Sequence, residues 1–403
     1  MVAGRHVVLG VSGGIACYKS CIVARRLAEA GADVDVVMTA AATEFIRPLT
    51  FEALTGRPVV TSLWEPGRAL DHVRLGRQPE LIIVAPATAQ LIARMAAGIA
   101  DDFLTALLLA RSAPLLLCPA MNDRMFGHPA TLANLETLRS RSAARAPLTI
   151  LGPATGPLAI GEGEGRGRMV EPEEIVAHAE RLLRSAPPFA GAHVVVTAGP
   201  TREAIDPVRV VTNRSSGRMG YALAYAAWRR GADVTLISGP VDIPVPPGMK
   251  RVRIETTEEL QEAVSRSLSM ADALIMAAAP ADYKPEKTAA QKLKRETGPL
   301  TLKLEPTQDV LASTAYWRRS SAVIVGFALE THDLVARART KLAQKQLDLV
   351  VANLVGADTG PEAATNQVTL VTKDGAEEVP LMSKEGAAEA ILDRMAALMA
   401  ARG

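Results

Sequence analysis

The residues from 194 to 240 concentrate polar side chains that could bind an anion. Their pattern predicts a buried strand, a polar loop, an amphipathic helix that ends at Gly231, and a second strand. The loop contains hydroxyl, amide, carboxylate and guanidinium groups, at Thr201, Arg202, Asp206, Arg209, Thr212, Asn213, Arg214, Ser215 and Ser216. Ligands of α/β sheets bind beside the carboxyl ends of parallel strands, and helix N-termini attract anions. A solvated surface loop is the alternative, but this density of donors before a helix favours an anion or nucleotide site.

A second candidate site begins at the glycine turn Ser12-Gly13-Gly14, between a strand predicted at 6–11 and a helix predicted at 15–30. Glycines let backbone N–H groups approach a phosphate, although a tight turn also needs glycine without any ligand. The turn lacks the GxGxxG pattern of dinucleotide sites. Two more strand ends, Ala87-Thr88 and residues 119–122, are expected at the same edge of the sheet. Asn122 would point into the crevice there, or would simply form a turn.

Several titratable residues fit a reaction mechanism, and each also has a structural interpretation. His72 has Asp71 beside it, which could orient it as a proton carrier, but a lone histidine is more often structural. Asp282 follows a strand predicted at 273–278, where a carboxylate could hold Mg²⁺. Lys292 lies in a basic stretch, 284–299, predicted to be a loop. Lysines 341 and 345 would share one helix face, which is the expected pattern of either a phosphate site or a solvated surface.

Composition limits the possible classes of protein. The chain has 403 residues, of which 48% are hydrophobic and only 3% aromatic, so its cores must be aliphatic. The net charge of +2 argues against nucleic-acid binding as the main function. No apolar run approaches the roughly 18 residues that span a membrane, and the chain enters a strand without a leader, which predicts a cytoplasmic protein. The three cysteines form neither a disulfide framework nor a CxxC pair.

One strand–turn–helix–strand plan occurs twice, and the junction Gly-Ala-Asp-Val recurs at residues 31–34 and 231–234. The repeat predicts two doubly wound parallel-sheet domains, residues 1–189 and 190–403, of which the first is flavodoxin-like and the second ends in a hairpin. The hairpin is predicted at 367–372 and 376–380, and a final helix should be capped by Ser383. Residues 152–168 are too glycine-rich for a regular element and predict a mobile flap.

The segments VSGGIACYKS, DHVRL, APATAQLIARMAAGIADDFL and PAMNDRM, in this order, resemble the flavoprotein family that contains phosphopantothenoylcysteine decarboxylase. The resemblance implies FMN, bound at a subunit interface of a trimer. It assigns His72 to oxidative decarboxylation and Asn122 to the substrate carboxylate. The implied FMN contacts are Ser12, Gly13, Gly14, Thr39, Ala87, Thr88 and Gln90.

The flap departs from this family's pattern, which places a proton-donating cysteine in an Ala-Cys-Gly context. Here the position is Ile160, which cannot donate a proton. Either Glu162, Glu164 or a water delivers the proton, or the decarboxylase half releases an oxidised enethiol slowly. Gln90 and Arg94 also replace the Asn and Lys usual in this family.

The segments TAGPTREAIDPVR, TNRSSGRMG, AAPADY, KLKR, GFALET and KLAQKQLDLVVAN resemble bacterial phosphopantothenate–cysteine ligase. With the first half, the chain resembles the bifunctional enzymes of coenzyme A biosynthesis. The resemblance implies CTP, Mg²⁺ at Asp282, and the substrates 4′-phosphopantothenate and cysteine. Asn213 would polarise an acyl-cytidylate, and Lys292 would close on the triphosphate. The implied CTP contacts are Met276, Ala277, Ala278, Asp282, Lys292, Gln308, Asp309, Val310, Leu311, Phe327, Lys341 and Lys345.

The family is also associated with dimers of the ligase half and a dodecamer of trimers and dimers. Two alternatives come from other classes of protein. A non-catalytic flavoprotein regulator would fit the missing flap cysteine, and an NAD-dependent dehydrogenase would fit the two strand–turn–helix units. An intermediate possibility is a ligase whose decarboxylase half has weakened.

Overall fold

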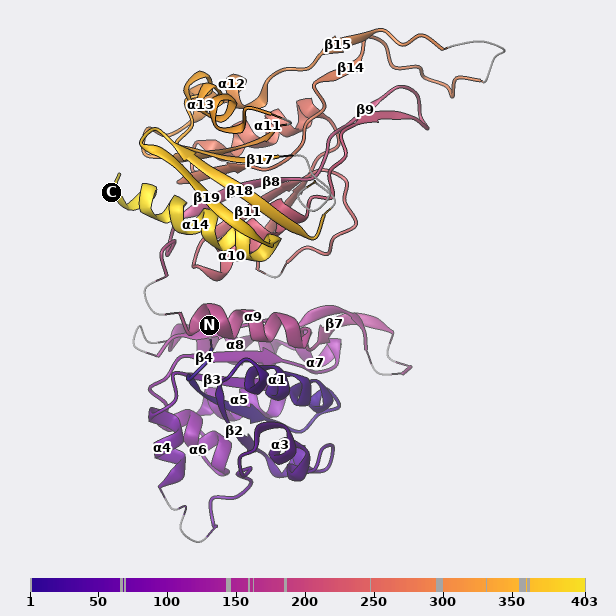
Figure 1. Cartoon of the computed structure of the whole chain (residues 1–403). Coiled ribbons are helices and arrows are strands. Elements are labelled where there is room, and N and C mark those ends of the chain that lie inside the picture. The colour runs from indigo at the N-terminus through magenta and orange to yellow at the C-terminus, as the bar shows by residue number, and fades with distance from the viewer. Residues whose placement is uncertain are drawn as a thin grey trace. The chain divides into compact units, whose positions relative to one another are not determined.

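The computed structural model describes residues 2–65, 68, 70–142, 146–158, 160–161, 163–184, 187–246, 248–294, 300–330, 332–354, 360 and 363–402. The chain divides into two compact units, residues 1–185 and 186–403 (Figure 1). Both units have helices packed on a mainly parallel sheet, so the predicted pair of doubly wound α/β units is confirmed.

The first unit contains a five-stranded parallel sheet in the order β2-β1-β3-β4-β5. This is the flavodoxin-like order, in which the direction of winding reverses between β1 and β3. The first four strands are almost entirely buried, because helices cover both faces, and their sequences are apolar apart from His6 on β1 and Asp33 and Asp35 on β2. The strands are β1 (His6–Val11), β2 (Asp33–Met38), β3 (Leu81–Ala87), β4 (Leu115–Pro119) and β5 (Leu148–Ile150).

The helices of this unit bury alternate strand residues on the two faces of the sheet. Val7 and Leu9 belong to a core shared with α1 and α9, whereas Val8 belongs to a core shared with α5 and α6. The helices are α1 (Cys17–Glu29), α2 (Ala40–Thr43), α3 (Pro48–Thr55), α4 (Asp71–Arg77), α5 (Ala89–Ala97), α6 (Phe103–Ala110), α7 (Asp123–Gly127), α8 (Pro129–Ser140) and α9 (Pro172–Leu182). α1 begins two residues later than predicted, because Cys17 N donates to Gly14 O in a turn (3.0 Å).

The second unit contains an eight-stranded sheet in the order β12-β11-β8-β13-β16-β17-β18-β19. The first six strands of this order are parallel and follow the Rossmann arrangement, and the last two form the predicted antiparallel hairpin. The strands are β8 (His193–Ala198), β11 (Asp233–Ser238), β12 (Lys250–Arg253), β13 (Ala273–Met276), β16 (Val323–Glu330), β17 (Leu349–Leu354), β18 (Thr365–Thr372) and β19 (Gly375–Ser383). β13 ends two residues earlier than predicted, where Ala278 N turns to donate to Thr197 Oγ1 (3.0 Å).

Two groups of helices pack on this second sheet (Figure 1). α10 (Arg218–Arg229) packs against α14 (Lys384–Ala400), and Arg230 forms an ion pair with Glu389. The predicted cap of α14 is confirmed, because Ser383 Oγ accepts from Gly386 N (3.1 Å). The second group of helices shares a hydrophobic core with the sheet and consists of α11 (Thr257–Leu268), α12 (Val310–Ser313) and α13 (Leu334–Gln344). The short 3-10 helix η1 (Ala315–Trp317) follows α12.

Three antiparallel pairs of short strands lie in or beside segments predicted as irregular, whereas residues 286–294 of the predicted 284–299 loop contain no helix or strand, as expected. β6 (Ala154–Pro157) pairs with β7 (Glu164–Arg168), β9 (Arg202–Ala204) pairs with β10 (Val210–Thr212), and β14 (Tyr283–Pro285) pairs with β15 (Leu304–Pro306). The prediction that residues 152–168 lack regular structure is therefore wrong. Their glycines serve close packing instead, since a Cβ on Gly167 would lie 2.0 Å from Met121 O.

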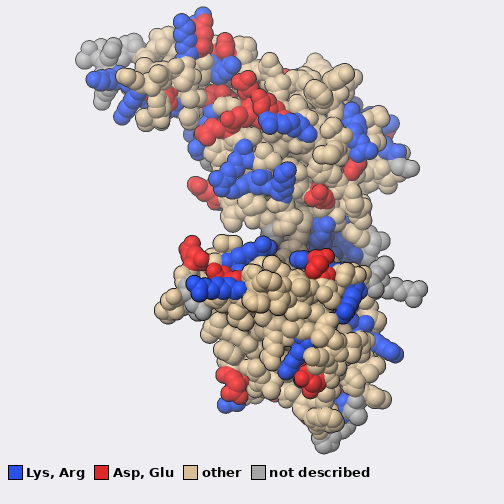
Figure 2. Space-filling view, turned by 180° about the vertical axis from the view of Figure 1, so that it is seen from behind, with Lys and Arg blue, Asp and Glu red and all other residues tan. Residues whose placement is uncertain are grey.

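The surface shown in Figure 2 carries Lys and Arg side chains beside Asp and Glu side chains. Positive and negative side chains are thus intermixed on this face, as they are nearly balanced in the whole sequence. Among the described helices, none combines the length and hydropathy needed to span a bilayer.

Asp35 on β2 makes the stability of the first unit depend on pH. Burial alone would raise the pKa of Asp35, but hydrogen bonds from His6 and Arg57, each 2.7 Å, lower it to about 2. A carboxyl group whose folded-state pKa lies below its unfolded value stabilises the fold above about pH 4 and loses this effect as pH falls toward 2. We expect about 2 kcal/mol of unfolding free energy to disappear over this interval.

Hydrogen exchange of peptides from β1 and β2, measured from pH 5 to pH 2, tests this expectation. Asp35→Asn should flatten the pH dependence, and Asp33→Asn is the matched control because the Asp33 side chain is 66% exposed. An unchanged pH profile in Asp35→Asn contradicts the assignment.

Candidate functional site

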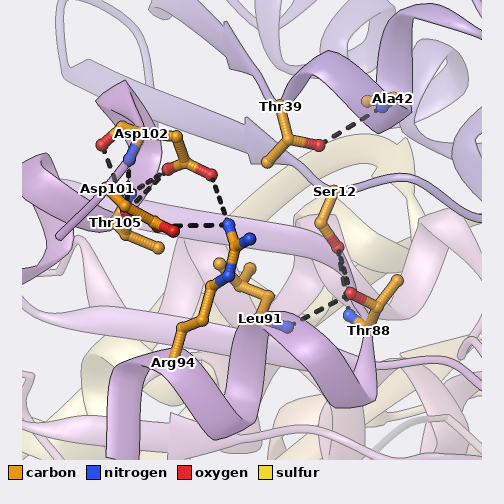
Figure 3. Close-up of polar contacts among 9 residues, drawn as sticks. All are labelled: Ser12, Thr39, Ala42, Thr88, Leu91, Arg94, Asp101, Asp102 and Thr105. Carbon is orange, nitrogen blue, oxygen red and sulfur yellow. Dashed lines mark hydrogen bonds and ion pairs between the residues drawn. The ribbon is translucent and has the colours of Figure 1, made fainter. Parts of the chain in front are cut away.

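Three strand ends of the first unit lie at one edge of its sheet, and Ser12 connects two of them (Figure 3). Ser12 Oγ donates to Pro86 O (2.8 Å) and accepts from Thr88 N (3.0 Å). Thr88 Oγ1 in turn caps α5 by accepting from Leu91 N (3.4 Å). This junction of β1 and β3 is the point where the winding reverses, which is where sheets of this order bind ligands.

The third strand end comes from β2. Thr39 Oγ1 caps α2 by accepting from Ala42 N (3.2 Å; Figure 3). Gly13 permits the close approach of α2, because a Cβ at Gly13 would lie 2.5 Å from Ala41 Cβ. The edge thus collects Ser12–Gly14, Thr39, Ala87, Thr88 and the exposed Gln90, together with the N-terminal N–H groups of nearby helices. Such an edge can hold a phosphate and a flat ring beside it.

Arg94 joins α5 to the start of α6 (Figure 3). Its Nη1 atom lies 3.2 Å from Asp101 Oδ1 and 3.1 Å from Asp102 Oδ2. Asp102 caps α6 by accepting from Thr105 N (2.7 Å). The arginine that departs from the family's usual lysine therefore fixes the connection between two helices.

His72 does not have the environment expected from the sequence. Asp71 pairs with Arg74 (3.0 Å), three residues away on the same helix, so the prediction that Asp71 orients His72 is wrong. Adjacent helical side chains diverge, whereas those three apart face each other. His72 Nδ1 is buried without a hydrogen-bond partner, and the ring meets Phe103 edge-on with centroids 6.3 Å apart.

His72 lines an open cavity of about 530 Å³ outside the Ser12 edge. The other lining residues are Leu63, Trp64, Ala100, Ala106, Leu109 and Ala110. Trp64 is 88% exposed, and Leu109 is also exposed. In the described part of the chain, no hydrogen bond or ring contact connects His72 to Ser12, Thr39 or Thr88.

Asn122 caps the short helix α7, since its Oδ1 accepts from Arg124 N (2.9 Å). It therefore does form a turn, as one of the two interpretations predicted. The β6–β7 hairpin packs on the same segment: Met121 N donates to Gly167 O (3.0 Å), and a Cβ on Gly165 would lie 2.6 Å from Asp123 Cβ.

One of the flap residues proposed as proton donors, Glu164, lies on this hairpin. Ile160, at the tip between β6 and β7, is fully exposed. Glu164 is the first residue of β7, and Glu162 lies outside the described residues.

The second unit contains a cavity of about 300 Å³ at the carboxyl edge of its sheet. Its lining residues come from the ends of β13 and β16, from the segment before α12, and from the last turn of α13. They are Met276, Ala278, Pro280, Ala281, Asp282, Thr307, Gln308, Asp309, Val310, Leu311, Phe327, Lys341 and Lys345. The structure thus brings together ten residues of the predicted nucleotide set. Ala277 and the exposed Lys292 are absent from the lining.

Lys341 and Lys345 supply the cationic groups of this cavity, beside the carboxylates of Asp282 and Asp309. Lys341 Nζ donates to Phe327 O (2.6 Å), and burial lowers the pKa of this lysine. Lys345, the residue after α13, forms an ion pair with Asp309. Burial raises the pKa of Asp309, but hydrogen bonds from Lys345 and Ala312 N outweigh it and lower the pKa overall.

Asn213 lies beside this cavity. Its Nδ2 donates to Pro280 O (2.8 Å), and Asp282 lines the cavity two residues further along. No group of three or more His, Cys, Asp or Glu side chains among the described residues could hold a metal ion. A single carboxylate such as that of Asp282 could supply one oxygen ligand, since Mg²⁺ usually binds one or two carboxylates together with phosphates.

The sequence interpretation missed Pro280, Ala281 and Thr307 as cavity residues. The first two follow β13 directly and precede Asp282, so their place after a predicted strand was an available signal. Thr307 had no comparable signal, because its place at the cavity depends on tertiary hydrogen bonds from Thr307 N to Asp282 O (2.9 Å) and from Thr307 Oγ1 to Ala281 O (2.6 Å).

The fold and these two edges define a two-unit α/β enzyme with a separate ligand site in each unit. Residues 1–184 match the family model described as flavoprotein, and residues 189–399 match the C-terminal domain of DNA/pantothenate metabolism flavoprotein. The chain belongs to the family of coenzyme A biosynthesis bifunctional proteins CoaBC. It is thus a flavoprotein of coenzyme A biosynthesis that carries a ligase and a decarboxylase activity.

The relatives span the whole chain. The protein of Vibrio cholerae is 47% identical over 97% of this chain and 98% of its own length. That of Escherichia coli K12 is 44% identical over 98% of this chain and 97% of its own length. The solved C-terminal domain of a coenzyme A biosynthesis bifunctional protein CoaBC is 35% identical, with a TM-score of 0.46, and the match covers 53% of this chain and 98% of that domain.

We expect Gly167→Ala to detach the β6–β7 hairpin from the Asn122 segment. The new Cβ would lie 2.0 Å from Met121 O, and backbone atoms cannot yield that far without loss of the Met121–Gly167 hydrogen bond. Limited proteolysis between residues 157 and 164 should become faster by about tenfold or more, on the order of the 1–2 kcal/mol typical of a lost buried hydrogen bond.

Gly156→Ala on the same hairpin is the control, since its Cβ would make only ordinary contacts of 3.5 and 3.6 Å with Arg168. Equal cleavage rates in the two variants would show that Gly167 does not anchor the hairpin.

Proposed function

We propose that the second unit joins 4′-phosphopantothenate to cysteine with CTP, and that the first unit decarboxylates the product to 4′-phosphopantetheine. The observation that carries the proposal is the single cavity that gathers Asp282, Lys341, Lys345 and Phe327 beside Asn213. A carboxylate must be activated by a triphosphate before an amine can attack it. This cavity has lysine ammonium groups that can bind phosphates, together with a hollow of the size of a nucleotide base.

Activation brings two anions together, because the carboxylate of 4′-phosphopantothenate attacks the α-phosphate of CTP. Lys341 and Lys345 would offset this repulsion, and Lys292 would move from its exposed segment onto the triphosphate. Mg²⁺, held by Asp282 and the phosphates, would neutralise charge on the departing diphosphate.

Asn213 acts in the second step, when the cysteine amine attacks the acyl-cytidylate and CMP leaves. The bond from Asn213 Nδ2 to Pro280 O uses one N–H and fixes which way the amide faces, because a carbonyl can only accept. The second N–H of the amide is left to donate to the acyl carbonyl, where negative charge develops.

FMN is the flavin that the Ser12 edge would hold, with its phosphate at Ser12–Gly14 and Thr39. The N-termini of α2 and α5 at this edge, and the lack of a Cβ on Gly13 that lets α2 pack close to the turn, support this fit. When bound, FMN supplies reversible two-electron oxidation of the thiol-bearing carbon, which gives the electrons of the departing carboxylate an acceptor. Ala87, Thr88 and Gln90 would orient the ring, and Asn122 would hold the substrate carboxylate.

His72 would act on the flavin site of a neighbouring copy. It lines a cavity apart from the Ser12 edge, beside the exposed side chains of Trp64, Leu70 and Leu109. Exposed apolar surface of this kind is typical of a contact between subunits. The proposal therefore includes trimers formed by the first unit. In place of the flap cysteine, Glu164 or a water would deliver the last proton.

The second unit would dimerise through its paired hairpins, where Val208, Tyr283 and Leu304 are exposed, and trimers and dimers together would form a dodecamer. A cytoplasmic location is part of the proposal, in keeping with three cysteines that are all free.

The proposal is tested by supplying 4′-phosphopantothenate, cysteine and CTP to the purified protein and identifying the products by mass. We expect a yellow protein, CTP-dependent diphosphate release, CO2 and 4′-phosphopantetheine. Accumulation of the enethiol would show that Ile160 has weakened the first half, and Ile160→Cys should then restore 4′-phosphopantetheine. Absence of diphosphate release would overturn the assignment of the second unit.

Asn213→Ala should leave acyl-cytidylate formation intact and slow its reaction with cysteine by about 10²- to 10³-fold, as expected for one lost oxyanion donor. Single-turnover quench experiments should therefore show the intermediate accumulating. Gln367→Ala is the control, because this exposed amide bonds to Glu378 on the distant β19 (2.6 Å). Normal turnover of cysteine in Asn213→Ala would contradict the role.

A further inference from the structure

We propose that Thr201 is the positioning residue of the ligase site, where it sets the distance between Asn213 and the segment that follows β13. This inference rests on the proposed function for the role of Asn213, but the hydrogen bonds that support it are independent of any reaction. Thr201 is completely buried and touches neither the cavity nor a predicted substrate position.

A closed ring of hydrogen bonds passes through Thr201. Ala281 N donates to Thr201 Oγ1 (2.8 Å), which lies 2.9 Å from Thr257 Oγ1, and Thr257 Oγ1 donates to Ala281 O (3.4 Å). Each hydroxyl has one proton, so the direction of Thr257 toward Ala281 O requires Thr201 to donate to Thr257. The ring thus satisfies both backbone groups of Ala281, which is 2% exposed.

The backbone of Thr201 holds the neighbouring strand β10. Thr201 O accepts from Thr212 Oγ1 (2.7 Å), and Thr201 N donates to Ala279 O (3.4 Å). Asn213 comes directly after Thr212, and its amide is anchored on Pro280 O, between Ala279 and Ala281. One residue therefore ties together the strand that supplies Asn213 and the segment that receives it.

Two further elements stabilise the ring. Thr257 is the first residue of α11, and its N–H donates to Glu203 Oε1 on β9 (2.8 Å). Glu203 is buried, and a carboxylate at a helix N-terminus is favourable. Thr307 Oγ1 also donates to Ala281 O (2.6 Å), which connects the ring to the segment before α12. Pro280, Ala281 and Asp282 line the cavity, and the ring holds this segment in place through the backbone of Ala281.

Removal of the Thr201 hydroxyl would leave the buried Ala281 N–H without its acceptor. The segment 279–282 would then move to find water, and Pro280 O would move with it. A shift of about 1 Å between catalytic groups typically costs about 10²-fold in rate. The base pocket at Phe327 and Lys341 comes from β16 and α13 and does not depend on the ring.

The test compares Thr201→Val, which keeps the shape, with Thr201→Ser, which keeps the hydroxyl. In Thr201→Val we expect the reaction of acyl-cytidylate with cysteine to slow by about 10- to 100-fold, and the KM for CTP to rise as well, because Asp282 lies in the segment that moves. Thr201→Ser should recover the rate to within about threefold, because a serine hydroxyl can close the same ring.

Thr372→Val is the matched control, since Thr372 is also a buried threonine and its hydroxyl accepts from Arg394 on α14 (3.4 Å), away from the ligase cavity. Decarboxylation of supplied 4′-phosphopantothenoylcysteine should stay unchanged in all three variants, because that activity belongs to the other unit. A Thr201→Val enzyme that reacts with cysteine within threefold of the parent rate overturns the proposal. So does a parallel loss of CTP binding that Thr201→Ser does not rescue, because that pattern indicates general unfolding.

Amide hydrogen exchange at Ala281 gives a readout that does not depend on activity. We expect exchange at least about tenfold faster in Thr201→Val and parent-like exchange in Thr201→Ser and Thr372→Val. If the parent protein makes no acyl-cytidylate, the proposed function fails and exchange at Ala281 alone decides whether the ring holds this segment. Unchanged exchange in Thr201→Val overturns the inference.

Discussion

The need to pair the backbone groups where parallel strands end dominates both units. A parallel sheet delivers its strands to one edge, where each chain turns back and leaves N–H and C=O groups without ladder partners. In the first unit Ser12 Oγ, which follows β1, pairs two backbone groups at the end of β3, Pro86 O and Thr88 N. In the second unit Thr201 and Thr257 pair both groups of Ala281. The side-chain hydroxyls that satisfy these backbone groups also fix the backbone at the edge of the sheet where a ligand can bind.

The two units meet this need with different geometry, which suits different chemistry. Thr39 and Thr88 cap helices around the Ser12 edge, so its donors are mainly backbone N–H groups that favour a fixed phosphate. The edge of the second unit is lined by lysine and carboxylate side chains, which can follow a triphosphate as its charge changes. A flavin that stays bound would need the fixed donors of the first edge. A nucleotide that is consumed in each turnover would need the charged side chains of the second.

Both sheets, the C-terminal hairpin and the cap at Ser383 could be predicted because each depends on local periodicity or on a single turn. Most of the nucleotide cavity could also be predicted, since its residues follow strands whose carboxyl ends must meet. Asp71 was paired with the wrong residue because adjacency was taken for contact, although helical side chains three residues apart, such as Asp71 and Arg74, are the ones that face each other. The β6–β7 hairpin was missed because glycine lowers strand propensity, whereas here its small size is what permits contact with Met121.

The sequence by itself determined the two α/β units and the residue types at the edge of each sheet, because alternating apolar strands and amphipathic helices allow few other folds. Only the tertiary structure decided that His72 lies away from the Ser12 edge and that Thr201 connects Asn213 to Ala281. These outcomes depend on contacts between segments up to 80 residues apart. These contacts form because buried polar groups must find partners in three dimensions, and the local sequence pattern does not show which partners they find.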